Sequence, residues 1–371
     1  MIMLHVPNIG KQEIEAVNDC IKKNELGCRG NYVDKCYSWF RENLNIERIL
    51  LTASGSQALE IASLVVDCEE GSEIIFSTYS FPSTINPFVI RGFVPVLVEI
   101  NRQGNIDLNR IKEAVNKKTK AVVITNYAGW NEEISEIIEF CHARNILVVE
   151  DNAQGFLSEF KNKPMGTFGD IGILSFETTK TLTCGEGGAI IINNVDLWER
   201  TLMIANNGTT RQRHKMNPQI EYTWKTAGVN GCMSALNAAF LFGQLQHAQA
   251  DKKQRLKLAK KYVEVLSEYD FIMPKIHDGW NASMFYILTP NPKRSEQLKK
   301  LLNEQGIQAL AHYGSLRNAV MGKNMKYLGS NEAEHFDQRM IRLPLYAGMD
   351  EDVIDRIGNI IREACDLSQG L

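Results

Sequence analysis

The 371-residue sequence lacks the features that would point to several classes of function. It contains no CxxC pair among its eight cysteines, so it indicates neither a zinc site nor a disulfide framework, and we expect free thiols in a reducing cytosol and no bound metal. It has no run of 18 apolar residues, and charges come too early at its start for a secretory signal. We therefore expect a soluble, cytoplasmic protein with no membrane partner. Its net charge of -3 gives no reason to expect a nucleic-acid partner.

What the sequence does contain is a series of short β-branched runs separated by helical patterns. No P-loop or dinucleotide-binding glycine motif and no internal repeat accompanies them. The alternation of the two patterns predicts an α/β fold whose large domain is built on a mostly parallel, seven-stranded sheet. The strand-like runs lie at residues 48–52, 73–76, 94–99, 121–125, 146–150, 171–176 and 189–193.

A long helical pattern over residues 234–266 follows these runs. Beyond it, one strand-like run at residues 283–288 and two helical patterns suggest a second unit. We therefore predict a large domain over residues 1–245, including an N-terminal arm of about residues 1–30, and a smaller α+β domain over residues 246–371.

The most informative segment is Ser175-Phe-Glu-Thr-Thr-Lys180, which follows a predicted strand and precedes the glycines of Gly185-Glu-Gly-Gly188. Glycines let backbone approach a ligand closely, and partial burial favours the neutral lysine amine, which can attack an aldehyde. A lysine before a glycine turn is, by itself, more often an ordinary surface residue. Lys180 becomes a candidate for imine chemistry because other polar segments accompany it.

One of these segments is Asp151-Asn-Ala-Gln154, directly after the predicted strand at residues 146–150. Asp151 should therefore lie at the carboxyl edge of the sheet, where open α/β folds bind their ligands. A carboxylate there can keep a pyridine nitrogen protonated, so that the ring stabilises negative charge on carbon. An aspartate that merely caps the next turn fits this position equally well.

A third segment, at residues 51–59, joins a strand to a helix through a turn of small residues. The N–H groups of Gly55, Ser56 and Gln57 at the start of this helix can form an anion site suited to a phosphate. The common alternative is a plain serine N-cap.

A fourth segment is the aromatic loop Ser77-Thr-Tyr-Ser-Phe81, after the strand-like run at residues 73–76. Tyr79 or Phe81 can stack on a flat heterocycle. An aromatic residue packed into the core is the alternative.

Taken in order, these segments resemble the DegT/DnrJ/StrS family of nucleotide-sugar aminotransferases, which use pyridoxal 5'-phosphate (PLP). The likeness covers nearly the whole chain, and within the family the sequence is similar above all to the dTDP-4-keto-6-deoxyhexose 4-aminotransferases. Several motifs together are specific, whereas any one alone is not. They are Tyr127-Ala-Gly129, Ser175 to Lys180, Gly185-Glu-Gly-Gly188, Glu221-Tyr-Thr-Trp224, Ser234 to Ala239 and Arg342-Leu-Pro-Leu345.

The resemblance implies a fold-type-I PLP enzyme that forms a homodimer with shared active sites. It implies that Lys180 is catalytic and holds the cofactor as an imine, and that Asp151 pairs with the pyridine nitrogen. It further implies that Gln154 contacts the ring hydroxyl and that Phe81 covers the ring. The residues implied to hold the phosphate are Gly55, Ser56, Gln57, Ser175 and, from the partner subunit, Asn230.

The sequence also departs from the family pattern near the expected substrate. Glu177 stands where close relatives carry a histidine, and His312-Tyr-Gly-Ser-Leu-Arg317 lacks a proline and the last histidine of the relatives' motif. Arg317 can hold a diphosphate or carboxylate in bidentate fashion, or can be a solvated surface residue. The candidate substrate contacts are Tyr79, Glu177, Tyr313 and Arg317.

We therefore predict transfer of an amino group from an amino acid, with glutamate the first choice, to a nucleotide-linked keto-deoxysugar. The expected substrate is dTDP-4-keto-6-deoxyhexose, aminated at C4 for glycan or O-antigen synthesis. Three alternatives stay open: a sugar 3-aminotransferase, a PLP lyase with Cys184 as nucleophile, and a non-catalytic PLP-binding regulator. A sugar 3-dehydratase is disfavoured, because those enzymes resemble versions with histidine at the position of Lys180.

Overall fold

The computed structural model describes residues 1–369, together with the side chains of all of these except Met216 and residues 365–369. The strands are β1 (Ile49–Thr52), β2 (Glu73–Ser77), β3 (Val94–Val98), β4 (Thr119–Thr125), β5 (Leu147–Asp151), β6 (Glu159–Phe160), β7 (Lys163–Pro164), β8 (Ile171–Ser175), β9 (Gly188–Ile192), β10 (Phe285–Leu288), β11 (Lys326–Leu328) and β12 (Met340–Leu343). The α-helices are α1 (Lys11–Lys22), α2 (Asn31–Leu44), α3 (Gly55–Val65), α4 (Pro82–Ile90), α5 (Leu108–Ala114), α6 (Ile134–His142), α7 (Trp198–Ile204), α8 (Arg211–Met216), α9 (Ala235–Leu266), α10 (Pro292–Glu304), α11 (Glu332–Arg339) and α12 (Glu351–Gln369).

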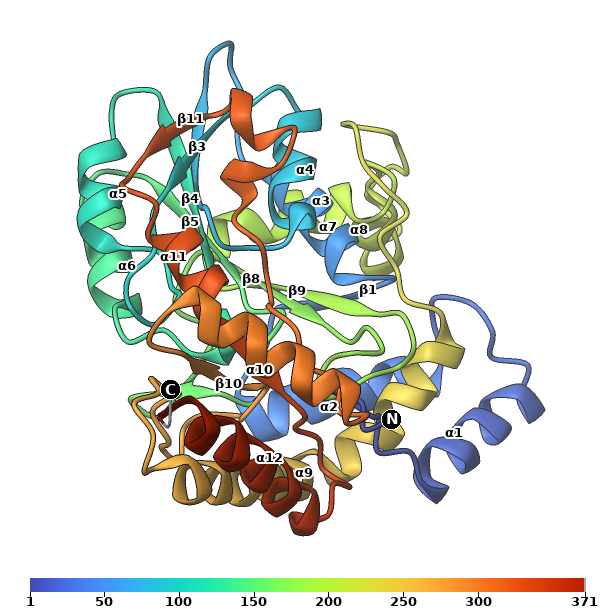
Figure 1. Ribbon diagram of the computed structural model, residues 1–371. Coiled ribbons are helices and arrows are strands. Elements are labelled where there is room, and N and C mark those ends of the chain that lie inside the picture. Colours follow the sequence, from blue (N-terminus) through green and yellow to red (C-terminus); the bar gives the residue numbers. More distant parts are fainter. Residues whose placement is uncertain (370–371) are drawn as a thin grey trace.

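Eight strands form one central sheet in the order β1-β9-β8-β5-β4-β2-β3-β11 (Figure 1). Only β9 runs antiparallel to its neighbours in this sheet. Successive residues of a strand point to opposite faces, so Val123 and Val149 pack under α3, α4 and α7, whereas Val122 and Val148 pack under α5 and α6. Burial on both faces explains why these strands are nearly continuous apolar runs in the sequence.

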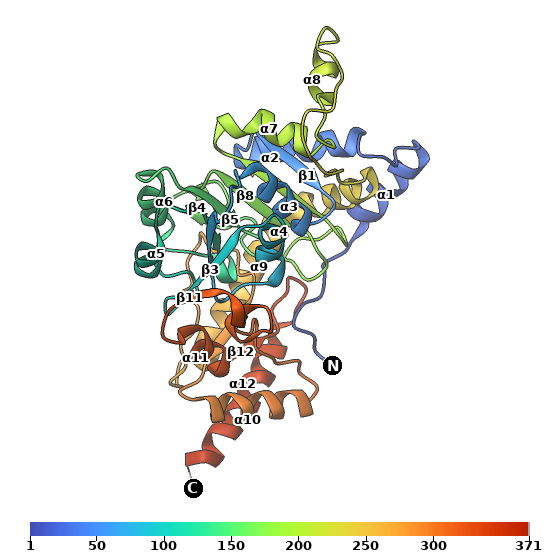
Figure 2. The ribbon, with the colours of Figure 1, turned by 90° about the horizontal axis from the view of Figure 1, so that it is seen from above.

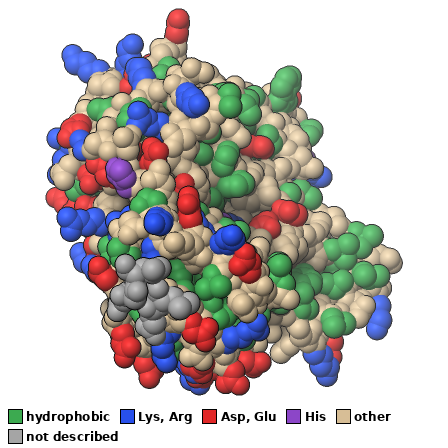
Figure 3. Space-filling model, viewed as in Figure 1, with side chains coloured by type: hydrophobic (Ala, Val, Ile, Leu, Met, Phe, Trp, Pro, Cys, Tyr) green, Lys and Arg blue, Asp and Glu red, His purple; other side chains and the backbone are tan. Residues whose placement is uncertain are grey.

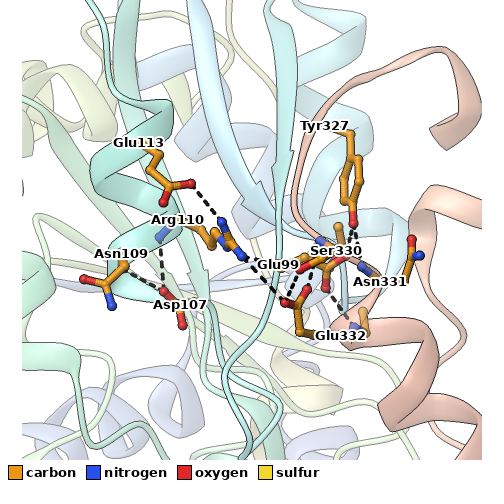
Figure 4. A network of polar contacts seen from close by, with 11 residues as sticks. Glu99, Asp107, Asn109, Arg110, Glu113, Tyr327, Ser330, Asn331 and Glu332 are labelled. Atoms are coloured by element: carbon orange, nitrogen blue, oxygen red, sulfur yellow. Dashed lines mark hydrogen bonds and ion pairs between the residues drawn. The ribbon is translucent and has the colours of Figure 1, made fainter.

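The α/β fold with its mostly parallel sheet is confirmed, but the sheet has one more strand than the predicted seven. The eighth, β11, comes from residues 326–328 and pairs parallel with the edge strand β3. A polar network at this edge holds it (Figure 4): the buried Glu99 accepts hydrogen bonds from the hydroxyl of Tyr327 and the N–H of Ala333. A three-residue strand carries too little periodicity to be predicted, and its partner becomes known only from the tertiary structure.

The long helix α9 crosses the predicted domain boundary at residue 245. Its first half packs with α1 and α2 against β1 and β9, and its second half belongs to the core formed by β10, β12, α10 and α12. The predicted division at this boundary stays a prediction.

A disulfide between Cys28 and Cys232 corrects the expectation that all thiols are free. The two residues are 204 positions apart, and their Cα atoms lie 5.6 Å from each other. The bond ties the segment between α1 and α2 to the loop before α9, a proximity that sequence spacing does not reveal. Cys365 lies outside the described side chains, and the other five cysteines are free: Cys20, Cys36, Cys68, Cys141 and Cys184.

A buried polar cluster fastens the N-terminal segment to α9. His247 lies between two carboxylates, with Nε2 2.7 Å from Oε1 of Glu13 and Nδ1 2.9 Å from Oδ2 of Asp251. The hydrogen bond to Asp251 is the largest influence that raises the pKa of His247, which reaches about 9.

Across the part of the chain that the structure describes, no helix is both long and apolar enough to cross a membrane.

Candidate active site

The predicted residues converge on one cavity of about 310 Å³ at the carboxyl edge of the sheet. It is lined by residues at or just after the ends of β1, β4, β5 and β8, and His312 and Tyr313 of the C-terminal part close it. Parallel strands bring their carboxyl ends to one edge, which is why segments far apart in the sequence meet here. The predicted site residues on its wall are Gly55, Ser56, Phe81, Asp151, Gln154, Ser175, Glu177, Lys180 and Tyr313.

Lys180 reaches this cavity from a tight turn after β8, in which its backbone N–H donates to the carbonyl oxygen of Glu177 at 2.9 Å. Burial lowers the pKa of Lys180, and the positive charge of Arg342 lowers it further, whereas the negative charges of Asp151 and Glu177 raise it. The net effect is that the pKa of Lys180 is lower than that of a lysine in water, so the neutral amine is more accessible. A neutral Nζ is the form that adds to a carbonyl carbon.

Asp151 ends β5 and is 6% exposed. Its Oδ2 accepts a hydrogen bond of 2.6 Å from the hydroxyl of Thr84 on α4, and its Oδ1 accepts one from the N–H of Ala153. Burial raises the pKa of Asp151, while the Thr84 hydroxyl and the charge of Lys180 lower it. A buried carboxylate with only neutral hydrogen-bond donors is suited to a cationic ligand group, such as a protonated ring nitrogen.

The turn before α3 packs closely against the end of β8. A Cβ atom at Gly55 would lie 2.9 Å from Cβ of Ser175, so only glycine lets this turn approach the end of β8. The N–H of Gln57 is not free for a ligand, because it donates to Oγ of the N-cap Ser54 at 3.0 Å. The predicted anion site therefore rests on the N–H groups of Gly55 and Ser56 together with the hydroxyl of Ser175.

Two aromatic side chains, Phe81 and Tyr313, also line the cavity. The Phe81 ring is 54% exposed although it is large and apolar, and its centroid lies 5.9 Å from that of Tyr313. The Tyr313 hydroxyl accepts a hydrogen bond of 2.7 Å from Nε2 of Gln154, which fixes both side chains at the cavity. Tyr79 lies elsewhere: it is 0% exposed and packs against Tyr127 rather than lining the cavity, so its predicted contact with substrate gains no support.

Two more predicted residues lie outside the cavity. The guanidinium of Arg317 donates to Oδ1 of Asn331 and stacks over the ring of Tyr327, 4.0 Å from its centroid. Asn230 is exposed, and its backbone carbonyl accepts a hydrogen bond from the Gln57 side chain. Glu177, in contrast, does line the cavity, and its carboxylate accepts from the N–H and hydroxyl of Thr179.

The sequence prediction missed several residues of this site. Neither Thr84 nor Thr125 belongs to a recognisable motif. Thr125 is the last residue of the buried strand β4, and a polar residue in that position is a usable signal, whereas Thr84 lies on α4 and carries no such signal. Arg342 belongs to the motif Arg342-Leu-Pro-Leu345 and His312 to the altered C-terminal pattern, and the sequence predicts no role for either side chain. Both lie beside Lys180 in a small chamber of about 20 Å³ that adjoins the main cavity.

Comparison with known proteins agrees with this geometry. The sequence model of the DegT/DnrJ/EryC1/StrS aminotransferase family matches residues 7–362. The chain belongs to this family. GDP-perosamine synthase of Escherichia coli O157:H7 is 27% identical over 364 residues, 98% of each chain. The dTDP-4-dehydro-2,3,6-trideoxy-D-glucose 4-aminotransferase of Saccharopolyspora spinosa is 25% identical and covers 99% of this chain and 97% of its own.

Among solved structures, Helicobacter pylori PseC, an aminotransferase of pseudaminic acid biosynthesis, superposes with a TM-score of 0.90 at 23% identity, over 98% of each chain. The predicted family, the fold-type-I fold and a PLP-dependent aminotransferase are thus confirmed at the level of the family. The residues present fit the cofactor: an amine at Lys180, a buried carboxylate at Asp151, a glycine cradle at Gly55 and an exposed ring at Phe81.

Proposed function

We propose that this aminotransferase moves an amino group from an amino acid, with glutamate the first choice, to the C4 keto group of a nucleotide-linked 6-deoxyhexose. The observation that carries the proposal is the meeting of Lys180, Asp151 and the Gly55 turn in one cavity of a chain that belongs to this aminotransferase family. When bound there, PLP supplies an aldehyde that takes up the amino group and a ring that stabilises negative charge on carbon.

Lys180 has two tasks in this proposal. Its Nζ would attach the cofactor, and after release the same Nζ would take the proton from Cα of the amino acid and return it to the carbon on the other side of the amino nitrogen, as general base and then acid. Burial, which lowers the pKa of this amine, makes the proton easy to give up, and the nearby Asp151 and Glu177 keep the protonated form accessible. A lysine able to take both forms suits a reversible proton transfer.

The remaining residues orient the reacting groups and keep water away. Thr84 holds Asp151 in place for a cationic ring nitrogen, and Phe81 and Tyr313 offer apolar surface on which a flat ring can lie. Gly55, Ser56 and Ser175 are positioned for a phosphate, since a helix N-terminus attracts anions.

The lyase alternative gains no support from Cys184. This thiol is buried, does not line the cavity among the residues described, and lies near the backbone carbonyl of Glu186. Burial raises its pKa to about 12, so the nucleophilic thiolate is scarce at neutral pH.

The proposal includes a homodimer with shared active sites. Figure 2 shows that the segment carrying α8 projects away from the rest of the chain, and Tyr222 and Trp224 on it are 57% and 75% exposed. Figure 3 shows hydrophobic side chains gathered where Figure 1 places α1, and Ile14 and Ile21 of this helix are both more than half exposed. Exposed apolar surfaces of this kind are typical of protein interfaces.

In this arrangement Asn230, at the base of the projecting segment, contacts the phosphate bound by the partner subunit. A subunit-mixing experiment tests the arrangement. Inactive Lys180→Ala and Asn230→Asp chains, unfolded and refolded together in equal amounts, should regain about a quarter of the wild-type activity, because half of the dimers contain one intact site. If each site belongs to a single chain, no activity returns.

A substrate panel tests the reaction itself. We expect amination of dTDP-4-keto-6-deoxyglucose with glutamate as donor, and the position and orientation of the new amine follow from product mass and proton couplings. GDP-4-keto-6-deoxymannose and UDP-linked 3-keto sugars are tested as alternative substrates, because the relatives include enzymes named for GDP-, dTDP- and UDP-linked sugars. Amination of a 3-keto sugar alone, or release of ammonia without any keto acceptor, would overturn the proposal.

A further inference from the structure

Arg255 is a buried cation on the long helix α9, and the proposed chemistry has not yet used it. Its side chain is 3% exposed, and burial lowers its pKa to about 10, whereas the charge of Asp251 raises it. One terminal nitrogen donates to the carbonyl oxygen of Thr181, the residue after Lys180, at 3.3 Å, and Nε donates to the carbonyl oxygen of Asn281 at 3.2 Å. Because a buried charge is costly unless its donors are satisfied, these two bonds fix the side chain in place.

Asn281 extends this connection to the segment that follows β5. Its side chain is fully buried, and its Nδ2 donates to the backbone carbonyl oxygen of Gln154 at 2.8 Å. Gln154 lines the main cavity and lies three residues after Asp151. A chain of hydrogen bonds therefore runs from the turn of Lys180, through Arg255 and Asn281, to the segment that carries Asp151.

The hydrogen bonds of Arg255 end on backbone carbonyls and not on a ligand site. Among the described residues, Arg255 lines neither the main cavity nor the small chamber that adjoins it. Its influence on the reaction must therefore pass through the turn that it holds. The helix α9 suits this task, because it belongs to the cores of both parts of the chain. Oε1 of Gln244, on the same helix, also accepts a hydrogen bond of 3.3 Å from the N–H of Thr183, three residues after Lys180.

We propose that Arg255 is a positioning residue that fixes the turn of Lys180 relative to the segment of Asp151, and so sets the position from which Nζ of Lys180 moves a proton. This inference rests on the proposed aminotransferase function, in which one amine must reach two carbon atoms in succession. A displacement of about 1 Å at such a site can lower the rate about 100-fold. Arginine suits the position better than lysine, because its fork lets one side chain donate to two carbonyls in different segments.

A matched pair of variants on α9 tests the proposal. Lys252 is also a buried cation of this helix, 7% exposed, and its Nζ donates to the carbonyl oxygen of Leu157 at 2.8 Å. In Arg255→Met, we expect the maximal rate of nitrogen uptake from glutamate to fall about 10- to 100-fold, while the glutamate concentration that gives half of that rate stays the same. Lys252→Met should keep the wild-type rate. Arg255→Lys keeps the charge but loses the fork, and should fall between wild type and Arg255→Met.

Hydrogen exchange of the cofactor-free protein, followed by mass spectrometry, gives a second readout. Peptides that cover residues 177–184 should exchange faster in Arg255→Met than in wild type or in Lys252→Met, whereas peptides from the central strand β4 should exchange as in wild type. Arg255→Lys is measured in the same way, so the test does not depend on whether Arg255→Met folds.

Two results would overturn the inference. The first is a loss in affinity for glutamate at an unchanged maximal rate. The second is exchange that accelerates equally in residues 177–184 and in β4, because this would mean that Arg255 only stabilises the fold. None of these measurements needs a sugar, so nitrogen uptake from glutamate without amination of any keto sugar would affect the proposed substrate and leave the role of Arg255 standing.

Discussion

Two walls of the active site differ in how they are built. The sheet-edge wall consists of residues in short loops directly after parallel strands, with Lys180, Asp151 and Gly55 as its main members. The closing wall consists of His312, Tyr313, Ser283 and Arg342, and of these Arg342 lies on β12, which pairs with β10. The first wall carries the residues that we propose perform the chemistry, whereas the second closes the cavity with residues from the C-terminal part of the chain.

The difference predicts that substitutions in the two parts of the structure have different effects on activity and on stability. Changes at the sheet edge should remove activity with little loss of stability, because these polar side chains lie in loops and contribute little to the core. Changes in the contacts that hold the rest of the chain against this edge should lower stability first.

The largest effect is expected for Lys180→Ala. Loss of the amine removes both the attachment of the cofactor and the proton transfer, so turnover should fall by at least about 10⁴-fold. Product formation from glutamate and keto sugar measures it, and the midpoint of urea denaturation of the cofactor-free variant should stay within error of that of the cofactor-free wild type. Lys253→Ala, an exposed lysine of α9, is the matched control. Retained turnover in Lys180→Ala would refute the assignment.

The second effect concerns stability. Replacing Cys28 and Cys232 by serine removes a link that closes a loop of about 200 residues, and the free energy of unfolding should fall by about 2–5 kcal/mol. Urea denaturation of the oxidised protein measures it, with Cys68→Ser as control. A wild-type protein whose denaturation midpoint does not respond to a reducing agent would show that the bond is not formed.

A pH-dependent effect is expected for the N-terminal segment. The pKa of His247 is raised from 6.5 to about 9, so its charged contacts stabilise the fold fully below pH 6.5 and are lost as the pH rises through 9. Relative to wild type, His247→Gln should lower the free energy of unfolding by about 3 kcal/mol at most at pH 6, and the difference should shrink toward pH 10. A difference that does not depend on pH would contradict this origin.

The smallest effect is expected for Thr84→Val. The hydroxyl of Thr84 lowers the pKa of Asp151, so its removal raises that pKa and moves the acid limb of the kcat/KM profile to higher pH. At the pH optimum we expect a loss below about 10-fold. Thr84→Ser keeps the hydroxyl and should leave the acid limb in place. An unmoved limb in Thr84→Val would mean that Asp151 does not govern it.

The sheet-edge wall was largely predictable from the sequence. Lys180, Asp151, Gly55 and Ser175 each follow an apolar strand within a few residues, and the carboxyl ends of parallel strands share one edge. Two details were not predictable. The Gln57 N–H is taken by its own N-cap, and the ring of Tyr79 turns into the core, because local hydrogen bonding and packing decide these orientations.

The α/β fold, the family and the loops that meet at Lys180 could be inferred from the sequence alone, since apolar periodicity and strand-end motifs are local properties of the chain. The distant groups that complete the site could be recognised only in the folded structure. Arg342 comes to Lys180 through the pairing of β10 and β12, Cys28 meets Cys232 across 204 positions, and β11 joins the sheet from the C-terminal part. These contacts depend on the packing of whole elements, which no local pattern encodes.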